Sequence, residues 1–286
     1  MYETHEHAPI NQSKLSVRKI LKESWDLSTK YFKALVLPFL IISIPNLFLA
    51  LSSKEKSSLG ISTIILTPIA IMGLHRTLLT LKSEGKHPTL RQTFEQGNEY
   101  WGRGFKIDLV YSLYLIPLIA LVICLMTPSF CVVDKDSAIW AVYFLSGLTI
   151  SIIVFYLFWA RTCLASAAMA DNKLGAFKTF RLAWTLTKGK LFKIICIHLT
   201  IDAISLFIVI PIVFLLGCLL GKLACVLSGI NSDDFNHPIF LSPIIVIFWL
   251  TFGYYTTFLQ INCNLIYQNL KVLEQNSDKE NHPIKI

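Results

Sequence analysis

Long apolar stretches that lack lysine and arginine alternate with polar stretches along this chain. A helix needs about 20 mostly apolar residues to cross the roughly 30 Å hydrocarbon core of a bilayer. Six stretches reach or approach that length, so we expect one spanning helix in each. The expected spans are residues 34–52, 57–75, 107–130, 137–160, 194–218 and 240–264. The sequence therefore predicts an all-α, polytopic integral membrane protein whose six helices form three hairpins.

The last apolar stretch, residues 235–270, is too long for a single crossing. We therefore expect its polar end, which carries Asn262, Asn264 and Gln268, to continue as a cytoplasmic helix. The predicted division of the chain is a disordered cytoplasmic tail at 1–13, one membrane domain at 14–272 and a second cytoplasmic tail at 273–286.

The basic residues are distributed unevenly among the polar stretches. Of 26 lysines and arginines, all but four lie in residues 1–33, 76–106, 161–193 and 271–286. Multi-span membrane proteins keep such residues on the cytoplasmic side. These segments are separated by pairs of apolar stretches, so the pattern predicts that both termini are cytoplasmic.

Composition supports a membrane location. Hydrophobic residues make up 54% of the chain and charged residues only 15%, whereas charged residues are about a quarter of a typical soluble protein. The net charge of +8 is concentrated at the ends of the apolar stretches. We therefore expect the partner to be anionic lipid headgroups at the cytoplasmic face rather than nucleic acid. A protein partner or a homo-oligomer is left open.

A short motif recurs before the first, third and fifth spans. In each copy a tryptophan precedes a Phe-Lys pair at the start of the apolar stretch. The expected interfacial contacts with lipid or a partner are Trp25, Lys33, Trp101, Lys106, Trp184 and Lys193. The copies indicate either an internal repeat of three helix-plus-hairpin units or independent enrichment of aromatic and basic residues at membrane boundaries.

The polar segments before these spans are amphipathic. Residues 15–33 and 174–186 each place apolar side chains on one helical face and basic side chains beside it. The middle segment, residues 90–105, contains three glycines, so the pattern predicts its helix less strongly. Two roles stay open for these cytoplasmic interfacial helices: they bind headgroups or partners, or they anchor the bundle.

Two runs carry a family resemblance. The first is Ser24-Trp25-Asp26-Leu27, which precedes Phe32-Lys33. The second is Ala176-Phe177-Lys178, followed by Ala183-Trp184-Thr185-Leu186-Thr187-Lys188-Gly189. With the apolar spans that follow them, these runs resemble bacterial six-helix inner-membrane proteins of poorly characterised families. These families include the membrane domain attached to some glycerophosphodiester phosphodiesterases. The resemblance implies the topology and a location in the bacterial inner membrane, and it implies no activity and no functional residues.

Three ionisable residues are candidates for polar groups within the membrane. His198 and Asp202 are four residues apart, on one face of the fifth helix, deep in the expected bilayer. An acid at that depth indicates a proton relay or a polar lining for a substrate. The alternative is a neutral Asp202 bonded to a polar side chain of a neighbouring span, such as Asn46 or Ser112. Asp108, near the start of the third span, is explained by Lys106 or a nearby arginine.

The seven cysteines show no CxxC pair and no neighbouring histidine cluster, so we expect no metal site and no cofactor. Cys131 and Cys225 fall in expected exterior loops, where an oxidising periplasm could join them as a disulfide. Two free thiols are the alternative.

Sequence motifs of nucleotide-binding loops, nucleophile elbows and zinc hydrolases are absent. We therefore expect no catalytic site and no enzyme activity. The favoured function is membrane or lipid homeostasis, or scaffolding, by an integral inner-membrane protein. The alternative is a transporter or channel for a small or amphipathic solute that uses the polar face around His198 and Asp202.

Overall fold

A computed structural model describes residues 15–42, 44, 59–85, 87–131, 138–229 and 238–281. These residues form helices joined by short turns, and no strand occurs among them. In chain order the elements are α1 (Val17–Lys30), α2 (Phe32–Leu35), α4 (Leu59–Glu84), α5 (Leu90–Cys131), α6 (Ala138–Thr162), α7 (Ala165–Asp171), α8 (Ala176–Leu186), α9 (Leu191–Ile204), the π-helix η1 (Ser205–Val209), α10 (Ile210–Leu227) and α11 (Pro238–Asn281). The expectation of an all-α protein is confirmed for this part of the chain.

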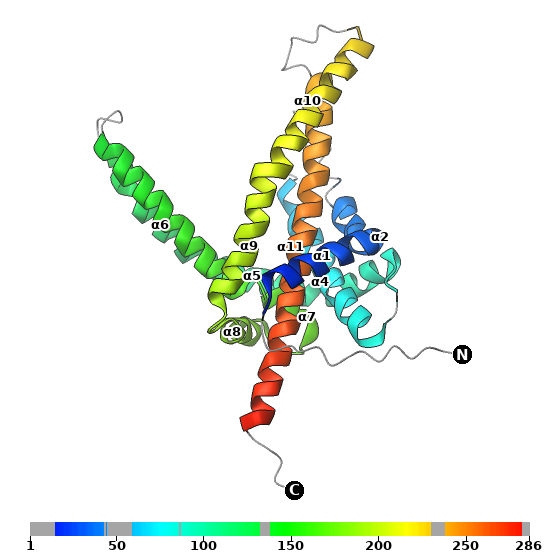
Figure 1. The fold of residues 1–286 in the computed structure, drawn as a ribbon, viewed down its shortest axis with the longest axis vertical. Coiled ribbons are helices and arrows are strands. Elements are labelled where there is room, and N and C mark those ends of the chain that lie inside the picture. The colour runs from blue at the N-terminus through cyan, green and yellow to red at the C-terminus, as the bar shows by residue number, and fades with distance from the viewer. Residues whose placement is uncertain are drawn as a thin grey trace.

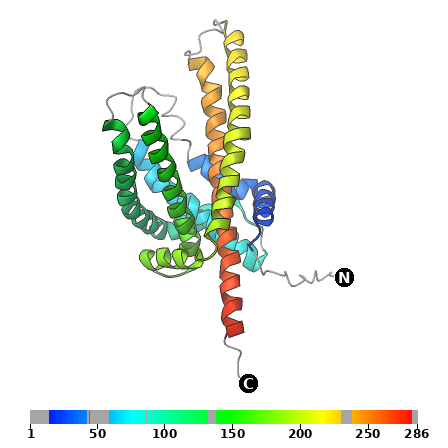
Figure 2. The same cartoon turned by 60° about the vertical axis from the view of Figure 1, so that its left-hand side comes forward.

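Two long helical hairpins extend from a smaller helical body (Figures 1 and 2). One hairpin consists of α5 and α6. The other consists of α9, η1 and α10 on one side and α11 on the other. The body contains α1, α2, α4, α7, α8 and the C-terminal part of α11, so α11 belongs to both parts.

Four segments are long and apolar enough to cross a membrane: Leu90–Cys124, Ile139–Asp171, Leu191–Leu227 and Ile239–Gln275. Few residues in their most apolar windows are buried within the protein. Exposed apolar helices of this length need lipid around them. The structure therefore supports a multi-pass membrane protein. These segments contain the fifth and sixth expected spans and most of the third and fourth, namely residues 107–124 and 139–160.

The first two expected spans lie partly outside the described residues. Of residues 34–52, the structure describes 34–42 and 44, within a short apolar helix, Phe32–Ile42. Of residues 57–75, α4 contains 59–75 and continues to Glu84, nine residues beyond the expected end. The expected tail at 1–13 lies outside the described residues, and the expected tail at 273–286 is helical as far as Asn281.

Separate helices, α1 and α8, form in the segments before the first and fifth expected spans. Ser16 caps α1, because its hydroxyl accepts a hydrogen bond from the Lys19 N–H. The middle segment instead continues without a break into the third span, as the single 42-residue helix α5. Its glycines are compatible with the helix because Gly97 and Gly104 lie at a close crossing with α4.

Glycines bring two pairs of helices close together, α4 with α5 and α10 with α11. A Cβ at Gly97 on α5 would be 2.2 Å from the Ile69 carbonyl oxygen on α4. On α10, a Cβ at Gly217 would be 2.9 Å from the Ile244 Cα, and one at Gly221 would be 2.5 Å from the Phe240 carbonyl oxygen. Gly217 and Gly221 form a G-x-x-x-G pattern, which allows close backbone approach of membrane helices. The pattern explains why α10 and α11 pack along their length.

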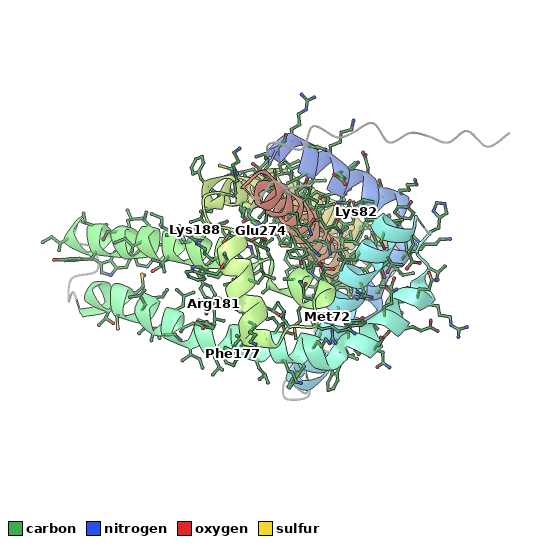
Figure 3. The ribbon with its side chains drawn as sticks, turned by 90° about the horizontal axis from the view of Figure 1, so that it is seen from below. Met72, Lys82, Phe177, Arg181, Lys188 and Glu274 are labelled. Carbon is green, nitrogen blue, oxygen red and sulfur yellow. The ribbon has the colours of Figure 1, made fainter. Side chains whose placement is uncertain are left out.

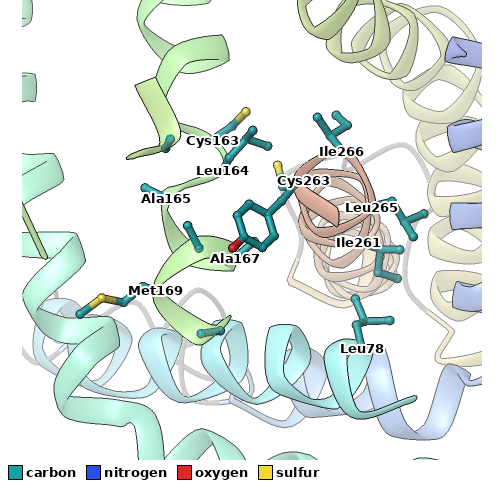
Figure 4. Close-up of a cluster of buried hydrophobic side chains, with 14 of the residues drawn as sticks. Leu78, Cys163, Leu164, Ala165, Ala167, Met169, Ile261, Cys263, Leu265 and Ile266 are labelled. Atoms are coloured by element: carbon teal, nitrogen blue, oxygen red, sulfur yellow. The ribbon is translucent and has the colours of Figure 1, made fainter. Parts of the chain in front are cut away.

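The hydrophobic core lies in the body and includes those ends of the hairpin helices that join it. Leu164, Ala167 and Ile266 are fully buried there, where α7 packs against α4 and α11 (Figure 4). The polar end of the last apolar stretch continues as a helix, as expected, because α11 extends without a break to Asn281. Its polar residues Asn262 and Asn264 are fully buried in this core.

Candidate functional site

Asp202 lies at the end of α9 and is held by tyrosines from two other helices. Its carboxylate Oδ2 accepts a hydrogen bond from the hydroxyl of Tyr156 on α6, and Oδ1 accepts one from the hydroxyl of Tyr255 on α11. The side chain thus joins both long hairpins. These partners take the place of Ser112, which was considered from the sequence, because the Ser112 hydroxyl donates within its own helix to the Asp108 carbonyl oxygen. Asn46, the other partner considered, lies outside the described residues.

The helix that carries Asp202 changes its winding directly after it. Residues Ser205–Val209 form the π-helix η1, and Pro211 is in the first turn of α10. Proline has no N–H to donate to the carbonyl group of Phe207, one turn earlier, and its ring disfavours regular α-helix there. Single π-helical turns often occur at functional sites. Pro211 therefore gives a local reason for the irregular turn beside Asp202.

A cavity of about 550 Å³ lies beside the Asp202 carboxylate. Its lining is mostly apolar, with the acid and the two tyrosines at one wall. The lining residues are Tyr156, Leu199, Asp202, Ala203, Ser205, Leu206, Phe207, Ile210, Phe248, Thr251, Phe252 and Tyr255. Because α6, α9, η1, α10 and α11 all contribute, the cavity lies where the two hairpins meet.

The hydrogen bonds from Tyr156 and Tyr255 explain how an apolar helix can carry the acid Asp202. Placing an aspartate at the centre of a spanning helix costs about 3 kcal/mol. A hydrogen bond to a charged group contributes about 1.5–3 kcal/mol. Two such bonds are enough to offset the insertion cost of Asp202. The half-buried carboxylate is therefore stable at the cavity wall and keeps acceptor capacity for a ligand.

His198, the second expected intramembrane residue, lies one turn before Asp202 but in different surroundings. Its side chain is buried, and neither ring nitrogen has a hydrogen-bond partner. The ring meets Trp159 edge to face, with ring centroids 6.1 Å apart. The shared helical face thus places the two residues near each other, but the structure contains no hydrogen bond between them.

Asp108 and Cys225, two other candidates from the sequence, do not line the cavity. Asp108 is exposed on α5, and its side chain forms no ion pair with any residue in the described ranges. The Cys225 side chain is buried near the end of α10. The side chain of Cys131 lies outside the described part, so the disulfide between these cysteines stays a prediction.

The expected interfacial residues lie on the protein surface or partly buried in it. Lys33, Lys106 and Lys193 are exposed, as are Trp25 and Trp184. The remaining member, Trp101, is partly buried and stacks on Phe105 with ring centroids 5.7 Å apart.

Trp25 and Trp184 have specific ring contacts. The Trp25 ring packs edge to face on Tyr254, whose hydroxyl is 2.9 Å from the Ser28 hydroxyl, so α1 is joined to α11. The Arg161 guanidinium lies over the Trp184 ring, 5.2 Å from its centroid. Trp25 therefore joins α1 to α11, and Trp184 joins α8 to α6. Both side chains are also exposed at the protein surface.

A buried polar cluster around His75 was not predicted from the sequence. His75 Nε2 is 2.9 Å from the Ser166 hydroxyl and 3.2 Å from Gln260 Oε1. Its Nδ1 is 3.0 Å from Asn264 Nδ2, and Gln268 donates to Asn264 Oδ1 at 2.5 Å. The cluster joins α4, α7 and α11. Its only sequence signal is the spacing of Gln260, Asn264 and Gln268 at one helical face.

Comparison of the chain with family models, with characterised proteins and with solved structures finds no match. The functional argument therefore depends on the geometry around Asp202. That geometry combines a large apolar cavity with one acid, which is the usual form of a small-molecule site.

Proposed function

We propose that the protein is an inner-membrane protein that binds an amphipathic, lipid-like molecule in the Asp202 cavity and so supports membrane lipid homeostasis. The observation that carries the proposal is the cavity of about 550 Å³, with an apolar lining and a single acid at its wall. Its size falls within the range of ligand pockets, about 300–1,000 Å³.

The surroundings of the cavity favour a ligand that enters from the lipid. Phe207, Leu206 and Phe252 line the cavity and are 75%, 57% and 59% exposed. In a bilayer these side chains contact acyl chains, so the cavity is continuous with the lipid phase. An acyl chain reaches it without crossing water.

The polar wall favours a head group that donates hydrogen bonds. The Asp202 carboxylate already accepts one bond at each oxygen, and each oxygen can accept another. An ammonium or hydroxyl group of the ligand would form a charge-assisted hydrogen bond there. Ser205 and Thr251 supply further hydroxyl groups in the lining.

The proposal includes six spans with both termini in the cytoplasm, the first two spans being those that lie partly outside the described residues. Exposed basic residues at the start of the apolar stretches support this orientation, namely Lys33, Lys106 and Lys193. Lys82, Arg181 and Lys188 are seen from the end opposite the hairpin tips (Figure 3). This end therefore faces anionic headgroups of the cytoplasmic leaflet.

The test is the quantity of amphiphile that remains bound to the purified protein, measured by native mass spectrometry and lipid extraction. Ala203→Trp adds an indole to the cavity lining and is expected to displace the ligand. Ile212→Trp, at a 53% exposed position on α10 outside the lining, is the matched control and is expected to retain it. Equal occupancy in wild type, Ala203→Trp and Ile212→Trp contradicts the proposal.

The irregular helix beside Asp202 favours a second candidate, a transporter. Transporter sites are often built where a spanning helix is interrupted at mid-membrane depth. Here η1 follows Asp202 after two residues. In reconstituted vesicles, proton-coupled flux of a solute that is lost in Asp202→Asn supports transport. Zero flux from both proteins leaves binding without translocation as the function.

A further inference from the structure

Two cysteines and a histidine from three separate elements meet in the core. Cys163 lies in the turn between α6 and α7, His198 lies on α9, and Cys263 lies on α11. The two cysteine sulfurs and one ring nitrogen of His198 lie within 4.8 Å of one another. Cys163 and Cys263 are on facing segments of the core (Figure 4). All three side chains are buried.

The histidine in this cluster lacks the partners that a buried polar group normally has. His198 is 1% exposed, and neither of its ring nitrogens has a hydrogen-bond partner among the residues that the structure describes. Leaving a buried polar group unsatisfied costs about 1–3 kcal/mol, and such groups are rare in folded proteins. A ligand that bonds to one ring nitrogen would remove much of this cost.

We propose that Cys163, His198 and Cys263 bind a zinc ion. Thiolate and imidazole are the ligands that zinc prefers, and sites with three protein ligands leave the fourth position to another molecule. No other histidine, cysteine or carboxylate belongs to the cluster within the described ranges. The fourth ligand therefore comes from water or from a small molecule.

The charge balance favours a divalent ion over a monovalent one. Two thiolates and a neutral imidazole carry a charge of −2, so Zn²⁺ forms a neutral centre. Cu⁺ binds the same donor types but would leave a net negative charge in an apolar core. Leu164, Ile197 and Ile266 are fully buried around this part of the core. These surroundings disfavour an uncompensated charge.

The spacing of the donor atoms suits zinc after a small adjustment. Zinc–sulfur bonds of about 2.3 Å place two sulfurs about 3.8 Å apart in a tetrahedral site. The cluster, with all donor atoms within 4.8 Å, needs side-chain movements of about 1 Å or less to reach that spacing. A turn residue, Cys163, is one of the three, so the adjustment does not require a helix to move.

The experiment measures metal binding by the full chain, purified in detergent under reducing conditions and stripped with a chelator. Added Zn²⁺ is expected to bind at one equivalent per chain. Added Co²⁺ is expected to give the thiolate-to-cobalt charge-transfer band and the intense visible bands of a tetrahedral site. Cys163→Ser and Cys263→Ser are each expected to weaken binding about tenfold or more, since even outer-shell partners of a metal contribute 10–100-fold.

The matched control is Cys196→Ser. Cys196 lies on α9 two residues before His198, is partly buried and is outside the cluster. Its loss is expected to leave zinc affinity and the cobalt spectrum unchanged. The wild-type cobalt spectrum is informative even where a serine variant does not fold. Absence of these bands from wild type, equal zinc binding by the cluster and control variants, or a Cys163–Cys263 disulfide under the same conditions overturns the proposal.

Discussion

Tyr255 on α11 donates a hydrogen bond to the carboxylate of Asp202 on α9, which is 53 residues away in sequence. Tyr156 on α6 donates to the other oxygen of the same carboxylate. Asp202 is therefore a junction of the two hairpins, and both the stability of the acid in the bilayer and the shape of the cavity depend on these phenols.

Tyr255→Phe is expected to lower the free energy of unfolding by about 1.5–3 kcal/mol, because it removes a hydrogen bond to a charged group. Tyr143→Phe on α6, where the side chain is 48% exposed, is the control and should change stability by less than about 0.5 kcal/mol. Reversible unfolding in detergent measures both. Equal effects of the two substitutions would show that the Asp202 bond contributes nothing to stability.

Gly221→Ala on α10 is expected to destabilise the protein by about 1–3 kcal/mol. The new Cβ would be 2.5 Å from the Phe240 carbonyl oxygen, so α10 and α11 would have to separate. Gly102→Ala, where nothing lies within 4 Å, is the matched control and should be neutral or stabilising by up to about 1 kcal/mol. Thermal unfolding in detergent compares them. A Gly221→Ala protein as stable as wild type contradicts the close helix contact.

Asn264→Ala is expected to destabilise the body by about 1–3 kcal/mol, since it leaves His75 Nδ1 without the amide 3.0 Å away. Asn269→Ala is the control, because the Asn269 amide bonds only to the Leu265 carbonyl oxygen one turn earlier on the same helix. Hydrogen exchange at α4 and α7 measures the effect. Unchanged protection in Asn264→Ala would contradict a structural role for the His75 cluster.

Features local to one helix were predictable from the sequence. The amphipathic patterns of α1 and α8, and the continuation of α11 beyond the expected sixth span, follow from periodicity and length. Asp202 could also be selected as a site residue, because one acid in a long apolar stretch is itself informative. The helix over residues 90–105 was predicted only weakly because of its glycines. The packing of Gly97 depends on contact with α4, which the sequence does not show.

Features that depend on contacts between distant segments were not predictable. Tyr156 and Tyr255 lie 46 and 53 residues from Asp202, and no spacing rule connects them. The same holds for Cys163, His198 and Cys263, which come from three elements and form no CxxC motif. The search for metal ligands by sequence spacing therefore missed this cluster.

The most direct test of the whole account is labelling of single introduced cysteines by a membrane-impermeant thiol reagent in intact cells, scored against the background of the wild-type chain. Six spans with cytoplasmic termini predict that cysteines at Ser53, Lys135 and Asp233 react and that cysteines at Gly85 and Asn172 are protected until the cells are opened. Labelling of Gly85→Cys or Asn172→Cys in intact cells, or protection at the other three positions, would contradict the predicted topology.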